Sequence, residues 1–383
     1  MPRDAHELSL SEVSVGLREL AFNEHTLLAL QQKFSDVRAL LAANVVGRVS
    51  RLDRGWSTIL MSAAGVPVRT RNIGADVAVG DWVVLSEDFE RVELVAARQS
   101  SLTRRVSSDV VRADSQTVAA NMDTVLVVQA ADVEPNLRRI ERELVLGFDS
   151  GATPVVVFNK CDELSETDIA QMMHNVQPVI AGVDAYAVSA KTGFGLDHLR
   201  NYTYKYESET PQTIAMLGAS GVGKSTLINS LVGHEVQRTG EVREGDSRGR
   251  HTTTASELVQ LANGGWLLDT PGLRVVSLWM SSNGIERAFA DVFEASNYCK
   301  FRDCKHENEP SCGVRAAVAN GEFTADRVAN MKTLVAEEVT LEKQQIEYAR
   351  TQDKRGVRKA TTNELGSQTT TQPLRHRQVY RKL

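Results

Sequence analysis

A glycine-rich stretch in the second half of the chain has the residue types and spacing of a phosphate-binding loop. It reads Gly-x4-Gly-Lys-Ser, after an expected strand at 213–217 and before a helix expected from Thr226. In that context main-chain N–H groups and a helix N-terminus can surround phosphates. Lys224 is expected to reach the β and γ phosphates, and the Ser225 hydroxyl to bind Mg²⁺. The expected phosphate-loop residues are Gly218, Ala219, Ser220, Gly221, Val222, Gly223, Lys224, Ser225 and Thr226.

Two motifs earlier in the chain predict the base of the nucleotide. An Asn-Lys-Cys-Asp run follows an expected buried strand at 154–158, and a Ser-Ala-Lys run follows the next strand at 185–188. A carboxylate at Asp162 can accept hydrogen bonds from N1–H and the 2-amino group of guanine, whereas adenine leaves that buried charge unsatisfied. Cys161 is read as a filler at a tolerant position. The expected base-binding residues are Asn159, Lys160, Cys161, Asp162, Ser189, Ala190 and Lys191.

An Asp-Thr-Pro-Gly motif comes after the phosphate loop, beginning at Asp269 and ending at Gly272. Asp269 would hold Mg²⁺ through water, and the Gly272 N–H would meet the γ phosphate. The next residue is Leu273, and its apolar side chain cannot orient an attacking water. We expect that role from His251, in a segment where Thr253 is the expected Mg²⁺ ligand. The alternative is that His251 is an ordinary solvated loop histidine.

A third group of residues has the chemistry of a metal site. Three cysteines and one histidine lie within 14 residues, in the spacing Cys-x4-Cys-x-His-x5-Cys. Thiolates and imidazole are the ligands that Zn²⁺ prefers, and four protein ligands close a tetrahedron. The cluster therefore predicts one structural zinc ion rather than a catalytic one. The expected ligands are Cys299, Cys304, His306 and Cys312.

The elements that must position these motifs alternate between strand and helix. Strands at 124–128 and 154–158 are continuous apolar runs, and a helix is expected at 137–146 with Glu141, Arg142 and Glu143 facing outward. Such alternation predicts a parallel sheet covered by helices, with a further strand at 256–261 pairing on an edge. The base motifs precede the phosphate loop, the reverse of the order in ordinary small GTPases. The order predicts a circularly permuted P-loop GTPase domain.

The N-terminal third has a different texture. One helix is expected at 27–41, followed by five short β-rich runs between residues 44 and 111. This spacing predicts a small closed β-barrel of the OB type, although other small barrels fit nearly as well. Its candidate RNA-contacting residues are Arg48, Arg51, Arg54, Arg69, Arg71, Arg91, Arg98, Arg104, Arg105 and Arg112, with Trp56, Trp82 and Phe89 as candidate stacking residues.

The composition is that of an ordinary water-soluble protein, with 42% apolar and 24% charged residues. The formal net charge of −5 argues against a general polyanion binder, but residues 341–383 carry ten Lys or Arg and four Asp or Glu. This basic tail suggests a local contact with nucleic acid, or else a solvated disordered segment. No secretory signal or membrane-spanning run is apparent. A cytoplasmic location without membrane contact is expected.

Taken together, the barrel, the permuted motif order and the cysteine–histidine spacing resemble the bacterial ribosome small subunit-dependent GTPase A family, over roughly residues 40 to 350. The resemblance implies GTP hydrolysis in late maturation of the 30S subunit, stimulated by that subunit, with the barrel and zinc domain contacting 16S rRNA. It also implies that His251 takes the role of the water-orienting glutamine that Ras-like enzymes carry where this chain has Leu273, and that the cofactors are Mg²⁺ with GTP and one Zn²⁺. A monomer is expected.

The expected fold class is multidomain: an N-terminal OB-like barrel, a central α/β permuted GTPase domain and a mainly α zinc domain. The expected domains are an extension at 1–40, the barrel at 41–113, the GTPase domain at 114–285, the zinc-binding helical domain at 286–350 and a basic, disordered tail at 351–383. Two other functions remain open. One is a GTP/GDP-dependent RNA-binding module with incidental hydrolysis, and the other is a permuted GTPase that serves the large ribosomal subunit.

Overall fold

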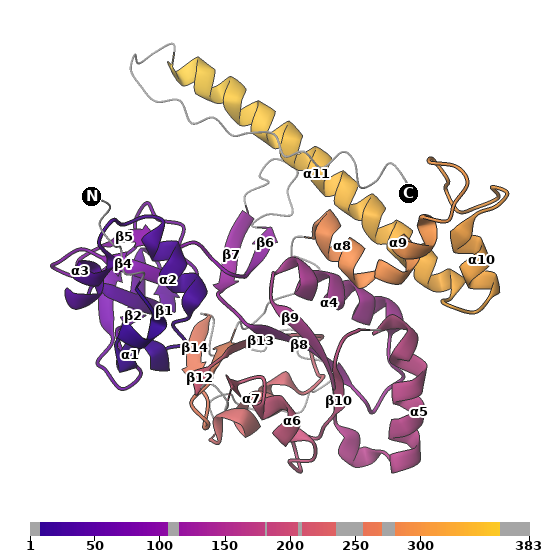
Figure 1. Cartoon of the computed structure of the whole chain (residues 1–383), viewed down its shortest axis with the longest axis horizontal. Helices are drawn as coiled ribbons and strands as arrows, with labels where there is room; N and C mark the ends of the chain where they lie inside the picture. Colours follow the sequence, from indigo (N-terminus) through magenta and orange to yellow (C-terminus); the bar gives the residue numbers. More distant parts are fainter. Residues whose placement is uncertain are drawn as a thin grey trace, which may run out of the picture. The chain divides into compact units, whose positions relative to one another are not determined.

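A computed structural model of the chain describes residues 8–105, 115–180, 182–205, 209–234, 256–269 and 280–360. The chain forms two compact units (Figure 1). The first comprises Met1–Arg104 and Gln116–Trp279, and the second comprises Arg105–Ser115 and Met280–Leu383. Each unit is described by itself below.

The centre of the first unit is a run of five parallel strands in the order β10-β9-β8-β13-β15. Apolar residues, mainly valine, isoleucine and leucine, dominate β8, β9 and β13, and these three strands are buried almost throughout, as expected for strands covered on both faces. The central α/β sheet and the permuted motif order are therefore as predicted. The strands are β8 (Thr124–Ala130), β9 (Thr153–Asn159), β10 (Ala185–Ala187), β13 (Thr213–Leu217) and β15 (Trp266–Asp269).

Helices and short turns connect these strands. They are α4 (Leu137–Asp149), η2 (Cys161–Glu163), α5 (Glu166–Val176), η3 (Gln177–Val179), α6 (Leu196–Arg200), the small strand pair β11 (Tyr204–Lys205) and β12 (Thr210–Pro211), and α7 (Lys224–Val232). The prediction that Glu141 and Glu143 face outward on α4 is wrong, since both are almost fully buried. Glu143 turns toward β8, where Gln129 supplies a hydrogen bond. A polar partner on the sheet thus draws a charged side chain inward, against the helix periodicity.

Strand β14 (Glu257–Gln260) corrects a second prediction. It pairs antiparallel with β15 on one side. A strand pairing at this place was expected, but β14 is not at the edge of the sheet. On its other side it pairs antiparallel with β1 (Val46–Asp53) of the N-terminal barrel, with Arg51 opposite Glu257. The nucleotide-domain sheet and the barrel therefore share one sheet of eleven strands.

The barrel contains β1, β2 (Trp56–Leu60), β3 (Val68–Arg71), β4 (Trp82–Leu85) and β5 (Val92–Val95). Strand β1 pairs with β2 and β4, β2 pairs with β3, and β4 pairs with β5. A parallel bridge between Arg71 and Arg91 brings the end of β3 to the start of β5. This pairing is compatible with the predicted OB-type barrel. A hairpin of β6 (Ser101–Arg105) and β7 (Ser115–Ala120) then leads into the parallel sheet.

The N-terminal extension holds several short helices instead of the one predicted at 27–41. They are η1 (Leu10–Glu12), α1 (Val15–Glu19), α2 (Glu24–Gln31) and α3 (Val37–Ala42). The chain breaks between α2 and α3 because the Asp36 carboxylate accepts a hydrogen bond from Ala39 N (3.0 Å) and caps a new helix. Apolar periodicity alone does not reveal such a cap.

Arg48 lies at the junction of these parts rather than on an RNA-contacting face, as had been predicted. Its side chain is 1% exposed. The guanidinium donates to Leu20 O (2.6 Å), Asn121 O (3.1 Å) and Thr213 Oγ1 (2.8 Å), and also to Gly80 O (3.3 Å). These acceptors belong to the N-terminal extension, the barrel and the nucleotide domain. The residue therefore joins three segments that are far apart in sequence.

The second unit is helical in its described part, as predicted (Figure 1). It contains α8 (Ser282–Ala288), α9 (Ala290–Ser296), α10 (Gly313–Ala319) and α11 (Ala325–Ala360). Helix α11 continues ten residues past position 350, so the predicted start of a disordered tail at 351 is wrong for residues 351–360. No helix in the described ranges is both long and apolar enough to span a bilayer.

Candidate functional site

The ends of β9, β10, β13 and β15 carry the predicted nucleotide motifs, and the parallel pairing brings these ends to one edge of the sheet. Asn159, at the end of β9, links three of the motifs. Its side-chain amide donates to Val222 O (3.1 Å) and Gly223 O (3.4 Å), and its Oδ1 accepts from Ala190 N (3.0 Å). The residue is 2% exposed. It therefore fixes the base-reading loops against the phosphate loop.

The carboxylate of Asp162 is held ready to accept hydrogen bonds. Ser189 Oγ donates to its Oδ1 at 2.7 Å, and Lys191 Nζ lies 3.5 Å from its Oδ2. The Ser189 hydrogen bond, reinforced by Lys191, lowers the pKa of Asp162. The carboxylate is therefore ionised at neutral pH, which the reading of guanine N1–H and its 2-amino group requires.

Lys160 has a partner that the sequence analysis missed. Its backbone is left-handed, with φ of 71°, and its Nζ lies 2.9 Å from the Asp132 carboxylate. Asp132 lies two residues past the end of β8, so the ion pair joins the ends of two neighbouring parallel strands. The sequence signal was an acidic residue just past a buried strand, where polar side chains commonly form ligand sites.

The phosphate loop connects β13 to α7, and its glycines are needed for shape. Gly218, Gly221 and Gly223 all have positive φ, which other residues rarely adopt. A Cβ on Gly218 would lie 2.4 Å from Val128 O, and one on Gly223 would lie 2.3 Å from Asn159 Nδ2. The loop therefore packs directly on β8 and on the base motif. Helix α7 begins at Lys224, two residues before the predicted start, so its N-terminus opens onto the loop.

The Lys224 ammonium group is bound to the start of this loop. Its Nζ donates to Gly218 O (2.8 Å) and Ala219 O (2.6 Å). Burial lowers the pKa of Lys224, while the nearby Glu143 raises it. A cation at this point can move from the two carbonyls to the phosphate oxygens of a nucleotide.

Ser225 is the first residue after Lys224 in α7, and Asp269 ends β15, the strand next to β13. A hydroxyl in the first turn of α7 and a carboxylate at the end of β15 are a donor set suited to Mg²⁺. The predicted residues His251, Thr253 and Gly272 lie outside the described residues, as do Leu273 and the rest of their segments.

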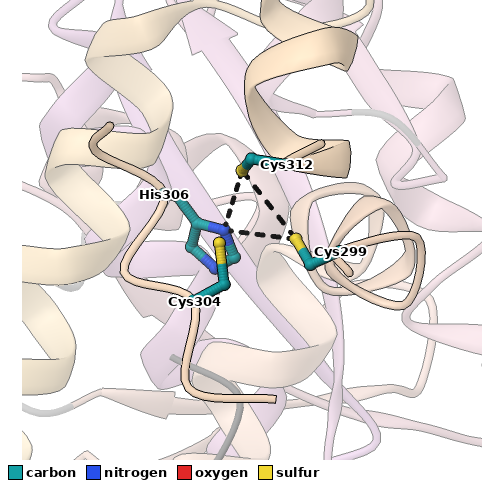
Figure 2. Close-up of side chains that lie close together, drawn as sticks. All are labelled: Cys299, Cys304, His306 and Cys312. Atoms are coloured by element: carbon teal, nitrogen blue, oxygen red, sulfur yellow. Dashed lines mark hydrogen bonds between the residues drawn. The ribbon is translucent and has the colours of Figure 1, made fainter. Parts of the chain in front are cut away.

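The second unit brings all four predicted metal ligands together (Figure 2). Their ligand atoms lie within 4.8 Å of one another. The Cys299 and Cys312 sulfurs are 3.8 Å apart, and His306 Nδ1 lies 3.5 Å from Cys299 Sγ and 3.4 Å from Cys312 Sγ. A tetrahedron with Zn–S bonds of about 2.3 Å has S···S edges of about 3.8 Å. The cluster therefore fits one zinc ion.

The chain around the cluster is folded to present these ligands. His306 adopts a left-handed backbone (φ 58°). The Glu309 carboxylate accepts main-chain hydrogen bonds from Lys305, Glu307 and Asn308, and these bonds lower the pKa of Glu309 to about 2. Burial raises the pKa of the Cys304 thiol, so a bound cation is needed to favour its thiolate.

Two family models match the sequence. One, described as RsgA GTPase, matches residues 95–279, and the other, described as 50S ribosome-binding GTPase, matches residues 213–348. Curated relatives match over most of the chain. "Small ribosomal subunit biogenesis GTPase RsgA 2" of Lactiplantibacillus plantarum is 38% identical over 304 residues, covering 76% of this chain and 83% of the relative. "Small ribosomal subunit biogenesis GTPase RsgA" of Methanosarcina acetivorans is 37% identical, covering 80% and 82%.

Solved structures agree with the topology. The chain is similar to YjeQ from Thermotoga maritima, with a TM-score of 0.57 and 26% identity, covering 77% of this chain and 98% of that one. A second neighbour, YloQ, titled a circularly permuted GTPase, has a TM-score of 0.53 and 23% identity, covering 77% and 95%, and shares the fold. With permuted guanine-nucleotide motifs gathered at one sheet edge and relatives matched over about three quarters of its length, this chain belongs to the RsgA GTPase family.

Proposed function

We propose that this protein hydrolyses GTP during late maturation of the small (30S) ribosomal subunit, and that the subunit stimulates the reaction. The observation that carries the proposal is Asn159, which ties the base motifs to the phosphate loop at one sheet edge. The curated relatives, named small ribosomal subunit biogenesis GTPases, indicate the particle on which the chain acts.

In this proposal Asp162 reads guanine while Ser189 and Lys191 keep it ionised and oriented. Lys224 leaves the Gly218 and Ala219 carbonyls to contact the β and γ phosphates. Ser225, Thr253 and Asp269 would hold Mg²⁺, directly or through water, and the ion would neutralise charge on the phosphates. The Gly272 N–H would contact the γ phosphate.

The attacking water needs an orienting group because Leu273 cannot supply one. We assign this role to His251, whose imidazole can accept a hydrogen bond from water near neutral pH. Intrinsic hydrolysis should then be slow, and contact with the small subunit should bring the histidine into place. Slow intrinsic turnover with strong stimulation suits an enzyme that times an assembly step.

We propose that the barrel is of the OB type and contacts 16S rRNA. The Arg69 and Arg71 guanidinium groups lie over the Trp56 ring at 5.1 and 5.4 Å from its centroid. Cationic groups beside an aromatic ring suit both phosphates and stacked bases. Trp82, predicted as a candidate stacking residue, is instead 1% exposed and belongs to the core. The basic tail and the zinc-bearing unit would provide further contacts.

The single zinc ion would be structural, since three cysteines and one histidine fill a tetrahedral site. A cytoplasmic monomer is proposed. The model described as 50S ribosome-binding GTPase keeps a large-subunit role as the second candidate. We favour the small subunit because that particle appears in the names of relatives that match over most of the chain. A GTP-dependent RNA-binding module with incidental hydrolysis is the third candidate.

The three candidates differ in what stimulates turnover. Phosphate release from Mg·GTP should be measured alone, with purified 30S particles and with purified 50S particles, for the native chain and for His251→Ala. We expect 30S particles to raise the turnover rate of the native chain only, while nucleotide affinity stays the same in the variant. Stimulation by 50S particles alone would favour the second candidate. Binding to 30S particles without faster turnover would favour the third.

A further inference from the structure

A buried acid on α4 and a buried amide on β8 lie together, and β8 is the strand on which the phosphate loop packs. Glu143 on α4 is 1% exposed, Gln129 on β8 is 5% exposed, and Gln129 Nε2 donates to Glu143 Oε2 at 2.5 Å. Gln129 interrupts a strand whose preceding residues, Val125 to Val128, are all apolar and fully buried. A buried polar pair of this kind costs stability unless it is satisfied, and none of the motif roles described above uses it.

The pair is placed by the pairing of β8 with β13. Val127 lies opposite Leu217, the residue just before the phosphate loop. One residue further, Val128 O is so close to Gly218 that a Cβ there would lie 2.4 Å away. Gln129 follows Val128 directly and holds the Glu143 carboxyl group by its hydrogen bond, and this carboxyl group is close enough to Lys224 for each to influence the pKa of the other.

The groups that act on the Glu143 carboxyl group come from three elements. Helix α4 itself contributes Arg139, β8 contributes the neutral Gln129, and α7 contributes Lys224. Among the described residues, the other elements in extensive contact with α4 are strand β9 and turn η3, and these two contain no ionisable side chain. Burial raises the pKa of Glu143 to about 7, against the opposing effects of Gln129, Arg139 and Lys224. The carboxyl group therefore changes charge in the physiological range.

We propose that Glu143 is a positioning residue for Lys224, and that it takes up a proton from solvent when nucleotide phosphates enter the loop. In the nucleotide-free site an ionised Glu143 attracts the Lys224 ammonium group toward the loop carbonyls. Phosphates bring negative charge to the same place, and a second buried anion nearby opposes them. Protonation removes that opposition, while the neutral carboxyl group can still accept the Gln129 hydrogen bond.

This inference rests on the proposed role of Lys224 in phosphate binding. The direction in which pH changes nucleotide affinity follows from the charges involved. The carboxyl group is more readily protonated in the nucleotide complex than in the free protein, so binding consumes a proton. Affinity is then highest at low pH and falls as pH rises through the pKa of free Glu143. A one-unit rise in that pKa on binding corresponds to about a tenfold loss of affinity at high pH.

The test is titration calorimetry of the full chain with Mg·GDP, at about pH 6 and about pH 8.5, in buffers of different ionisation enthalpy. Glu143→Gln keeps the shape and the acceptor oxygen but removes the charge and the titration. We expect it to match the native chain near pH 6 and to bind about tenfold more tightly near pH 8.5. Proton uptake by the native chain should be absent in this variant. Glu166→Gln, which removes an exposed carboxylate at the start of α5, should follow the native profile.

Gln129→Met provides a second measurement. This substitution removes a hydrogen-bond donor that favours the ionised form of Glu143. The fall in nucleotide affinity with rising pH should therefore move to higher pH. Thermal unfolding of each variant checks that it is folded.

Two results together would overturn this inference but leave the proposed function intact. They are the same dependence of nucleotide affinity on pH in the native chain and in Glu143→Gln, and loss of nucleotide binding in Lys224→Ala. Weaker binding by Glu143→Gln at both pH values would also overturn it, because the carboxylate would then assist nucleotide binding through its charge. If the native chain bound no guanine nucleotide, the proposed function itself would fail.

Discussion

Replacing Arg48 by methionine should destabilise the first unit more than any surface substitution. Methionine has a similar length and no polar head, so it can fill the space without donating hydrogen bonds. The native guanidinium reaches Leu20 O, Asn121 O and Thr213 Oγ1. It also lies 5.5 Å from the centroid of the Trp82 ring. Burial lowers the pKa of Arg48 to about 10, so the group stays charged at neutral pH.

The expected cost follows from the acceptors left behind. A buried acceptor that loses its partner costs about 1–3 kcal/mol, and breaking a buried charged network typically costs about 3–5 kcal/mol. Release of the desolvated charge offsets part of this. We therefore expect a net loss of about 3 kcal/mol, a large share of the roughly 5–15 kcal/mol that stabilises a typical domain. For a unit of this size that corresponds to a fall in Tm of roughly 6–12 °C.

Differential scanning calorimetry and urea unfolding of the full chain would measure this. Because Arg48 joins the N-terminal extension, the barrel and the nucleotide domain, we also expect the unfolding transition of the first unit to broaden or split in Arg48→Met. Arg51→Met is the matched control, since Arg51 lies on the same strand with its side chain about half exposed. If Arg48→Met shifted Tm no more than the control, the assignment of Arg48 as a structural junction would be refuted.

Three further predictions concern the two sites. Asp162→Ala should weaken GDP binding by about 3 kcal/mol, roughly a hundredfold, without improving the binding of adenine nucleotides. Equilibrium titration with both nucleotides would measure this, and equal losses of affinity for both purines would contradict the role of Asp162 in base recognition. Cys304→Ser should reduce zinc content from about one ion per chain and lower the Tm of the second unit, and unchanged metal analysis would contradict the ligand assignment. Glu143→Gln should gain stability relative to the native chain as pH rises from about 4.5 to about 7, by about 3 kcal/mol. In this range the native carboxyl group, whose pKa burial raises to about 7, keeps a proton that the unfolded chain releases, and above it the difference stays constant. A difference in unfolding free energy that does not change with pH would refute this.

Local patterns predicted which motif residues the structure brings together at the sheet edge and which four residues form the cysteine–histidine cluster. Motif residues such as Asn159 and Lys224 follow apolar runs directly, and parallel pairing brings those ends together without further information. The cysteine–histidine cluster is equally local, since its ligands span 14 residues. Short-range spacing is therefore enough when the fold class is recognised.

Contacts between distant segments were not predictable in the same way. Glu143 was expected in water because charged residues usually occupy the outer face of a helix, and only the hydrogen bond from Gln129 on β8 shows what it faces. Arg48 looks like any other arginine on a β-strand until Leu20, Asn121 and Thr213 meet around it. These features depend on register and on packing between segments tens to hundreds of residues apart, which hydrophobic periodicity does not encode.

The pairing of β14 with β1 has a practical consequence for dissecting the protein. A fragment that begins after the barrel would leave the outer side of β14 with unpaired main-chain N–H and C=O groups. Exposed edges of this kind recruit strands from other molecules. Such a fragment should tend to self-associate. Weak activity of the fragment would then result from the exposed edge of β14 rather than from the loss of an RNA contact.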